Sequence, residues 1–129
     1  MAKIVVVDGD VNAGGLLKNL IQTRLKDSVF YASDGVQALE VVRAQLPDLI
    51  ITDIKMSNMD GYEFVRQIRA DPLLKKTEVI FYSASFFEPA TAFSVALSLG
   101  VTNVLFKPAE QEEILQAINT ALTHVRHHT

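Results

Sequence analysis

The chain contains no cysteine, and this absence excludes several kinds of chemistry at once. Without thiols there is no disulfide framework, no thiolate nucleophile and no Cys-ligated metal. Basic residues are also few, since 12 Lys and Arg against 15 Asp and Glu give a net charge of -3. Phosphate backbones and anionic membrane surfaces attract clustered basic residues. We therefore expect neither nucleic acid nor a membrane as the direct partner.

Long hydrophobic runs are missing as well. The run from Met1 to Asp8 is too short for a signal-peptide core, and no later run approaches the ~18 apolar residues of a membrane span. We therefore expect a cytoplasmic protein. The chain has 129 residues, of which 49% are hydrophobic and 21% charged, and it contains no repeat or linker. One domain over residues 1–129 is the expected organisation.

Five short apolar runs, rich in β-branched residues, alternate with stretches of helical period. The predicted strands are residues 4–8, 29–32, 49–53, 79–83 and 103–106. A helix is predicted after each of them. This alternating (βα)5 pattern is typical of an α/β fold with a doubly wound, five-stranded parallel sheet, in which ligands bind at the carboxyl ends of the strands.

The helix boundaries carry recognisable signals. A short polar residue followed three positions later by Glu or Gln is a capping box, and it occurs at 34–37, 60–63 and 85–88. Pro89 is expected in a first helical turn, where its missing N–H costs nothing. Gly100 stands where a helix would need a left-handed residue to stop.

Four of the five predicted strands lead into residues capable of chemistry, namely Asp8, Asp53, Ser83 and, just past the last strand, Lys107. One polar residue after a strand commonly caps the next helix, but the four together are harder to explain as caps. Two carboxylates, a hydroxyl and an ammonium suit phosphoryl transfer. One carboxylate is the nucleophile, another helps to hold a divalent cation, and the other two groups bind phosphoryl oxygens.

The order of these residues resembles the receiver domain of two-component response regulators. The strongest likeness lies in the segment Asp48-Leu-Ile-Ile-Thr-Asp53-Ile-Lys-Met-Ser-Asn-Met-Asp60-Gly61, followed by Ser83-Ala84 and Lys107-Pro108. The resemblance covers nearly the whole chain and is as close to receivers of hybrid sensor kinases or multidomain regulators as to free-standing ones. It implies a flavodoxin-like fold with strand order 2-1-3-4-5.

The resemblance implies a signalling domain rather than an enzyme, capable at most of self-phosphorylation and autodephosphorylation. Asp53 would accept a phosphoryl group from a histidine kinase or phosphotransfer protein. Ser83 would be the switch hydroxyl, and Lys107 would contact the phosphoryl group and precede a cis peptide bond to Pro108. Phosphorylation would change the surface around the fourth helix, fifth strand and fifth helix, which an output domain or a second copy of the chain would contact.

The resemblance also implies a Mg²⁺ cofactor held by Asp8, Asp53 and the backbone carbonyl of Lys55. Receivers usually place two adjacent acidic residues after the first strand, but this chain has Asp8-Gly9-Asp10. Gly9 therefore replaces an expected metal ligand and weakens the magnesium prediction. Asp10 either replaces it as a ligand, with glycine permitting the necessary bend, or caps the first helix.

Two further positions depart from the family pattern. Val104 stands where the family often carries an aromatic switch residue. Lys55, two positions after the acceptor, places a flexible cation near the phosphoryl group, so an altered phosphoryl lifetime is expected. Gly61 follows the pattern and would support the turn after the acceptor strand.

Two alternatives remain open. Gly9 is compatible with a pseudo-receiver, which binds its partner without phosphorylation. The Asp8-Gly-Asp10 sequence also resembles the nucleophile motif of haloacid-dehalogenase-type phosphatases, with Asp8 as nucleophile, Asp10 as acid/base, and Ser83 and Lys107 on phosphate. That second alternative leaves the segment around Asp53 unexplained.

Overall fold

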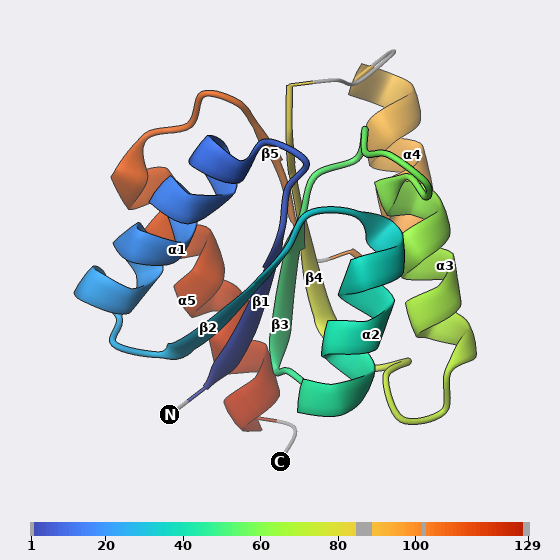
Figure 1. The fold of residues 1–129 in the computed structure, drawn as a ribbon, viewed down its shortest axis with the longest axis horizontal. Helices are drawn as coiled ribbons and strands as arrows, with labels where there is room; N and C mark the ends of the chain where they lie inside the picture. Colours follow the sequence, from blue (N-terminus) through green and yellow to red (C-terminus); the bar gives the residue numbers. More distant parts are fainter. Residues whose placement is uncertain (1, 85–88, 102, 128–129) are drawn as a thin grey trace.

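The computed structural model describes residues 2–84, 89–101 and 103–127 and shows a central sheet with helices on both faces (Figure 1). The strands are Lys3–Val7 (β1), Ser28–Ala32 (β2), Leu49–Thr52 (β3), Glu78–Ser83 (β4) and Asn103–Phe106 (β5). The helices are Val11–Arg24 (α1), Gly35–Gln45 (α2), Gly61–Ala70 (α3), Pro89–Ser98 (α4) and Gln111–His127 (α5). All five predicted strands are confirmed to within one residue at either end. Within the described ranges, no helix is both long and apolar enough to cross a membrane.

The sheet has the order β2-β1-β3-β4-β5, and every pair of neighbouring strands is parallel. The predicted doubly wound, flavodoxin-like fold is therefore confirmed. Helices α1 and α5 cover one face, whereas α2, α3 and α4 cover the other (Figure 1). Because α1 and α3 leave neighbouring strands β1 and β3 toward opposite faces, a crevice is expected at the carboxyl ends of these two strands.

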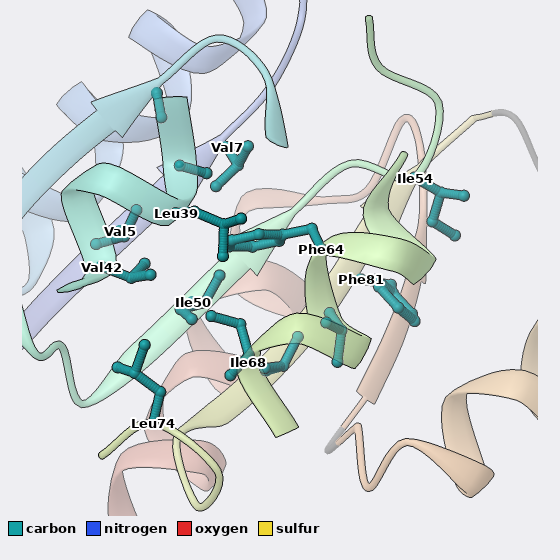
Figure 2. Packing of buried hydrophobic residues seen from close by; sticks show 14 of the residues in the cluster. Val5, Val7, Leu39, Val42, Ile50, Ile54, Phe64, Ile68, Leu74 and Phe81 are labelled. Carbon is teal, nitrogen blue, oxygen red and sulfur yellow. The ribbon is translucent and has the colours of Figure 1, made fainter. Parts of the chain in front are cut away.

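Two hydrophobic clusters hold the helices against the sheet. Alternate residues of β1 point to opposite faces, so Val5 and Val7 belong to the cluster under α2, α3 and α4, and Ile4 and Val6 to the cluster under α1 and α5. Figure 2 shows the first cluster, in which the fully buried Phe64 of α3 lies against the sheet. Burying each such side chain stabilises the fold by roughly 1.5–3 kcal/mol. The strands that carry the site are thus anchored on both faces.

Two of the three predicted helix caps are confirmed. Asp34 Oδ1 accepts a hydrogen bond from the backbone N–H of Gln37 at 2.8 Å, and Asp60 Oδ1 accepts one from Glu63 at 2.9 Å. Each bond satisfies an N–H that has no partner inside its own helix. The third predicted box, at 85–88, lies outside the described residues. Asp60 therefore fixes the start of α3, directly after the loop that follows Asp53.

One arginine fastens the end of α4 to the end of α3. Helix α4 begins at Pro89, and Gly100 follows its end with a φ of 65°, both as predicted. Arg69 of α3 donates through Nε to the carbonyl oxygen of Leu99 at 2.7 Å and through Nη2 to that of Gly100 at 3.1 Å. Its Nη1 reaches the carbonyl oxygen of Thr77 at 2.7 Å. The turn after α4 is thus held by side-chain hydrogen bonds as well as by packing.

Candidate functional site

Three charged side chains meet at the carboxyl edge of the sheet. Asp8 follows β1, Asp53 follows β3 and Lys107 follows β5. Lys107 Nζ donates to Asp8 Oδ2 at 2.6 Å and to Asp53 Oδ2 at 3.1 Å. The side chains are only 19% (Lys107), 5% (Asp8) and 14% (Asp53) exposed, so these charge-assisted bonds are shielded from water. The structure brings together three of the predicted site residues in one ion-pair network that keeps a net negative charge.

A backbone amide fixes the second oxygen of each carboxylate. Asp8 Oδ1 accepts a hydrogen bond from the N–H of Asp10 at 2.9 Å, and Asp53 Oδ1 accepts one from the N–H of Ile54 at 2.7 Å. Each carboxylate is therefore held from two sides, by its own loop and by Lys107. Such double restraint fixes the direction in which each group presents its oxygens.

The ends of β4 and β5 position Lys107. The Lys107–Pro108 peptide bond is cis, as predicted. The Lys107 N–H donates to the carbonyl oxygen of Ser83 at 3.1 Å, and its Nζ lies 5.4 Å from the centre of the Tyr82 ring. Ser83 is fully buried at the end of β4. The structure thus places Ser83 beside the backbone of Lys107, and its role as a switch hydroxyl stays a prediction.

The charge of Lys107 depends on its two partners. Burial by itself lowers the pKa of the ammonium, but the hydrogen bonds and charges of Asp8 and Asp53 outweigh burial, and the pKa rises above 10.5. When the pKa of a group is higher in the folded than in the unfolded protein, its charged form adds to the free energy of unfolding. That contribution is complete below the pKa of the unfolded state and is lost as the pH rises through the pKa of the folded state. The ion-pair network should therefore weaken in alkaline solution, where Lys107 loses its proton.

The variant Lys107→Met tests this pH dependence. We expect the free energy of unfolding of the wild-type chain to fall above about pH 10.4 by up to about 1.4 kcal/mol per pH unit more than that of the variant. Urea titrations in EDTA at a series of alkaline pH values measure this difference. Parallel pH profiles for the two proteins would show that the network contributes no pH-dependent stability.

The first loop offers fewer carboxylates than the family pattern. Asp10 caps α1, because its Oδ1 accepts hydrogen bonds from the N–H groups of Asn12 at 2.9 Å and Ala13 at 3.3 Å. A Cβ placed on Gly9 would meet only the carbonyl oxygen of Ser33, at 3.8 Å, which is an ordinary van der Waals contact. Among the described residues, no group of three or more acidic or histidine side chains is arranged to hold a metal ion. The two converging carboxylates are those of Asp8 and Asp53.

The loop after β3 is tightly closed on the start of α3. The N–H of Gly61 donates to the carbonyl oxygen of Ile54 at 2.6 Å. A Cβ on Gly61 would overlap the carbonyl oxygen of Asp53 and lie 2.8 Å from Ile54 Cα. Only a residue without a side chain permits this approach, which agrees with the predicted supporting role of Gly61. The exposed Lys55 lies within the loop, two residues after Asp53.

Sequence reasoning missed Tyr31, which supports the site from β2. Its hydroxyl donates to the carbonyl oxygen of Asp8 at 2.6 Å. Burial, followed by the charges of Asp8 and Asp10, raises the pKa of Tyr31 above 10.0, so the hydroxyl keeps its proton at neutral pH. The available signal was the pair Gly14-Gly15 inside a predicted helix, since glycine in a helical pattern often marks a close approach.

The aromatic residue of β5 lies elsewhere than in the family pattern. Val104 is partly buried and packs against the cluster under α2, α3 and α4. Phe106, two residues later, is 40% exposed, and its ring lies 5.8 Å from that of Phe93 on α4, in an edge-to-face arrangement. Aromatic contact between α4 and β5 is thus made at the position directly before Lys107.

The comparisons with known proteins identify a family for the chain. Residues 4–119 match the family model of the response regulator receiver domain. The chain is 33% identical over 124 residues to the transcriptional regulatory protein ZraR of Klebsiella oxytoca, which covers 95% of this chain and 27% of that protein. It is 31% identical over 116 residues to a probable chemotaxis protein CheY of Rhizobium etli. This alignment covers 90% of this chain and 88% of that protein.

Solved structures give the same result. The chemotaxis response regulator CheY4 of Vibrio cholerae is similar with a TM-score of 0.85 and 27% identity, over 94% of this chain and 98% of that one. The chain spans only 27% of the length of the Klebsiella protein, so the likeness concerns one part of that relative. Receiver domains act in two-component signalling and generally bind Mg²⁺ at their phosphorylation site. On its fold, its paired aspartates and its match to the family model, the chain belongs to the response regulator receiver domain family.

Proposed function

We propose that this chain receives a phosphoryl group on Asp53 from a histidine kinase or phosphotransfer protein and transmits the change through the surface formed by α4, β5 and α5. The observation that carries the proposal is the arrangement around Asp53. One carboxylate oxygen is held by the N–H of Ile54, and the other lies 3.1 Å from Lys107 Nζ at the open edge of the sheet. A carboxylate that is oriented but still 14% exposed can be reached by a donor.

The transfer itself requires little of the protein beyond positioning. An oxygen of the Asp53 carboxylate attacks the phosphorus, and the bond between phosphorus and the donor imidazole nitrogen breaks. That nitrogen keeps the electron pair and takes up a proton from solvent, leaving an acyl phosphate on Asp53. An ammonium has three N–H donors, and Lys107 gives two to Asp8 and Asp53, so the third can bind a phosphoryl oxygen.

Magnesium fits the residues present, with fewer protein ligands than the family pattern provides. Mg²⁺ prefers oxygen ligands and usually keeps several waters beside one or two carboxylates. Asp8 and Asp53 supply two carboxylates at one site, and we assign the backbone carbonyl of Lys55 as a third ligand. When bound, the cation neutralises charge on the phosphoryl oxygens. Asp10 is engaged as the cap of α1, so its carboxylate would have to leave this position to reach the metal.

The variant Gly9→Asp tests how the missing carboxylate at position 9 affects Mg²⁺ affinity and the stability of the metal-free protein. A Cβ at position 9 would meet nothing closer than 3.8 Å, so we expect the substitution to be accommodated by the backbone. We expect Mg²⁺ to bind about tenfold more tightly, because ligand charge and number set the affinity of such sites. We also expect the metal-free variant to be less stable, because a further negative charge joins Asp8 and Asp53. Calorimetric titration with Mg²⁺ gives the first quantity and urea unfolding in EDTA the second. Equal affinities in both proteins would contradict the assignment of position 9 to the metal site.

The proposed output surface has the composition of a contact surface. Among the side chains of α4 and β5 that the structure describes, the large apolar ones that are exposed are Phe93 at 51%, Leu97 at 82% and Phe106 at 40%. Exposed apolar groups that lie together commonly mark interaction sites. Phe106 directly precedes Lys107 in the chain, and it pairs in register with Ser83 of the neighbouring strand, so the surface adjoins two residues of the pocket. An output domain or a second copy of the chain would bind there.

A direct experiment tests the proposed function. The wild-type chain is incubated with acetyl phosphate and Mg²⁺, and its intact mass is measured. We expect a gain of one phosphoryl group, and with beryllofluoride in place of acetyl phosphate we expect a complex visible by fluorine NMR. If neither the mass gain nor the complex forms, phosphorylation of this chain is ruled out under these conditions and the proposal fails.

Gly9 keeps the pseudo-receiver as a second candidate, because the loop lacks a carboxylate that the family pattern provides. A magnesium titration separates the two. Binding at about millimolar or lower concentration that disappears in Asp53→Ala supports the phosphorylated receiver. No detectable binding supports the pseudo-receiver. The phosphatase alternative is not favoured, because residues 4–119 match the receiver family model.

A further inference from the structure

We infer that Tyr31 and Gly14 act together as a positioning pair, which holds the loop between β1 and α1 in the orientation that magnesium binding requires. The inference rests on the proposed function, because it concerns the same metal site. It assigns a role to two residues outside that site, one on β2 and one on α1. Neither would touch the metal or the phosphoryl group.

The first half of the pair is the hydroxyl of Tyr31. It donates to the carbonyl oxygen of Asp8 at 2.6 Å, while the N–H of Asp8 donates to the carbonyl oxygen of Ala32 at 3.1 Å. Asp8 is 3% exposed, so its carbonyl oxygen has little access to water. β2 therefore binds both backbone groups of Asp8, one through its main chain and one through a side chain. The peptide that joins Asp8 to Gly9 is fixed in orientation as a result.

The second half of the pair is the missing side chain of Gly14. A Cβ at this position would overlap Cε1 of the Tyr31 ring and lie 2.9 Å from Cδ1. The ring can occupy its place under α1 only because residue 14 has no side chain. Glycine within a helix is unfavourable by about 1 kcal/mol relative to alanine. The close packing of the Tyr31 ring against α1 therefore comes with a local loss of helix stability. The adjacent Gly15 meets nothing within 4 Å and makes no such approach.

The pair matters because position 9 carries no carboxylate. Metal binding by this loop must then depend on the direction of the Asp8 carboxylate and on the backbone around Gly9. The Asp8 carboxylate is set by two hydrogen bonds, from Lys107 at 2.6 Å and from the N–H of Asp10 at 2.9 Å. The Asp10 amide keeps its place only if the intervening peptides do, and Tyr31 holds the first of them. Groups that orient metal ligands in this way typically change metal affinity by 10–100-fold when they are removed.

The experiment compares Mg²⁺ binding by the full chain and by two pairs of variants. Tyr31→Phe removes the hydroxyl and keeps the ring, and Tyr62→Phe, on α3, is its control. Gly14→Ala displaces the ring and keeps the hydroxyl, and Gly15→Ala is its control. Calorimetric titration should show the dissociation constant for Mg²⁺ rising about tenfold in Tyr31→Phe and Gly14→Ala and changing less than about twofold in both controls.

A second measurement separates positioning from general loosening of the fold. The rate of phosphorylation by acetyl phosphate at saturating Mg²⁺ should stay within about twofold of wild type in Tyr31→Phe, while the Mg²⁺ concentration for half-maximal rate rises about tenfold. An unchanged dissociation constant in Tyr31→Phe overturns this inference even if Gly14→Ala does not fold. If the wild-type chain binds no Mg²⁺, the proposed metal site fails and this inference fails with it. Wild-type binding with an unaffected Tyr31→Phe variant leaves the proposed function standing and removes only the positioning pair.

Discussion

Replacement of Asp53 by asparagine is expected to abolish phosphoryl incorporation while the fold stays intact. An amide oxygen can still accept the hydrogen bond from the N–H of Ile54, but the amide has no anionic oxygen to attack phosphorus. Lys107 keeps its shorter bond to Asp8 at 2.6 Å, so the pocket retains one ion pair. Intact-mass measurement after treatment with acetyl phosphate and Mg²⁺ should show the phosphoryl group on wild type and none on Asp53→Asn.

The matched control is Asp60→Asn. This variant makes the same chemical change in the same loop, and asparagine caps a helix about as well as aspartate does. We therefore expect it to be phosphorylated like wild type. Phosphorylation of Asp53→Asn to the wild-type extent would place the acceptor on another residue and would contradict the proposed chemistry.

Among the variants considered, Gly61→Ala, which adds one methyl group, is expected to lower the free energy of unfolding most. The new Cβ would overlap the carbonyl oxygen of Asp53 and crowd Ile54 Cα, and both obstacles are backbone atoms that cannot rotate away. Forcing extra atoms into a closely packed site costs typically 1–3 kcal/mol, and this case should lie near about 3 kcal/mol. With a denaturant slope of about 1–3 kcal/mol per molar urea, the unfolding midpoint should fall by about 1–3 M.

Gly15→Ala is the control for that effect. It adds the same methyl group to an open position in α1, where nothing lies within 4 Å. We expect a gain of about 0.5–1 kcal/mol, because alanine is the better helix former. If the free energy of unfolding falls in Gly61→Ala and rises in Gly15→Ala, the loss is caused by crowding in the turn after Asp53. A general effect of replacing glycine would give both variants the same sign. Gly61→Ala with an unchanged midpoint would show that the turn can relax.

The meeting of Asp53 and Lys107 could be predicted from the sequence, because residues that end parallel strands necessarily share one edge of the sheet. The order of the strands could not be obtained from the alternating pattern alone, since periodicity does not say which strands are neighbours. It came from the resemblance to receivers. The structure then confirmed both the order and the cis bond before Pro108.

Other features of the site depend on distances that no local pattern contains. Asp10 had two possible roles, and the structure shows it as a cap because two unpaired N–H groups of α1 lie within reach of its carboxylate. Tyr31 reaches Asp8 across 23 positions in sequence, from the neighbouring strand, and only the packing of α1 on β2 brings Gly14 to its ring. The sequence shows that glycines stand in α1 but not which side chain fills the space they leave.

The hydrogen bonds of Arg69 have a geometrical consequence for how α4 can move. They fix the turn at its C-terminal end, at Leu99 and Gly100, to the end of α3. We therefore expect α4 to move by rotating about its C-terminal end, because a translation of the whole helix would break these hydrogen bonds. Ten residues make an arm of about 15 Å, so a swing of about 10° carries the other end roughly 2.6 Å. The end that moves is the N-terminus of α4 at Pro89. It lies at the carboxyl edge of the sheet, where β4 ends at Ser83 (Figure 1).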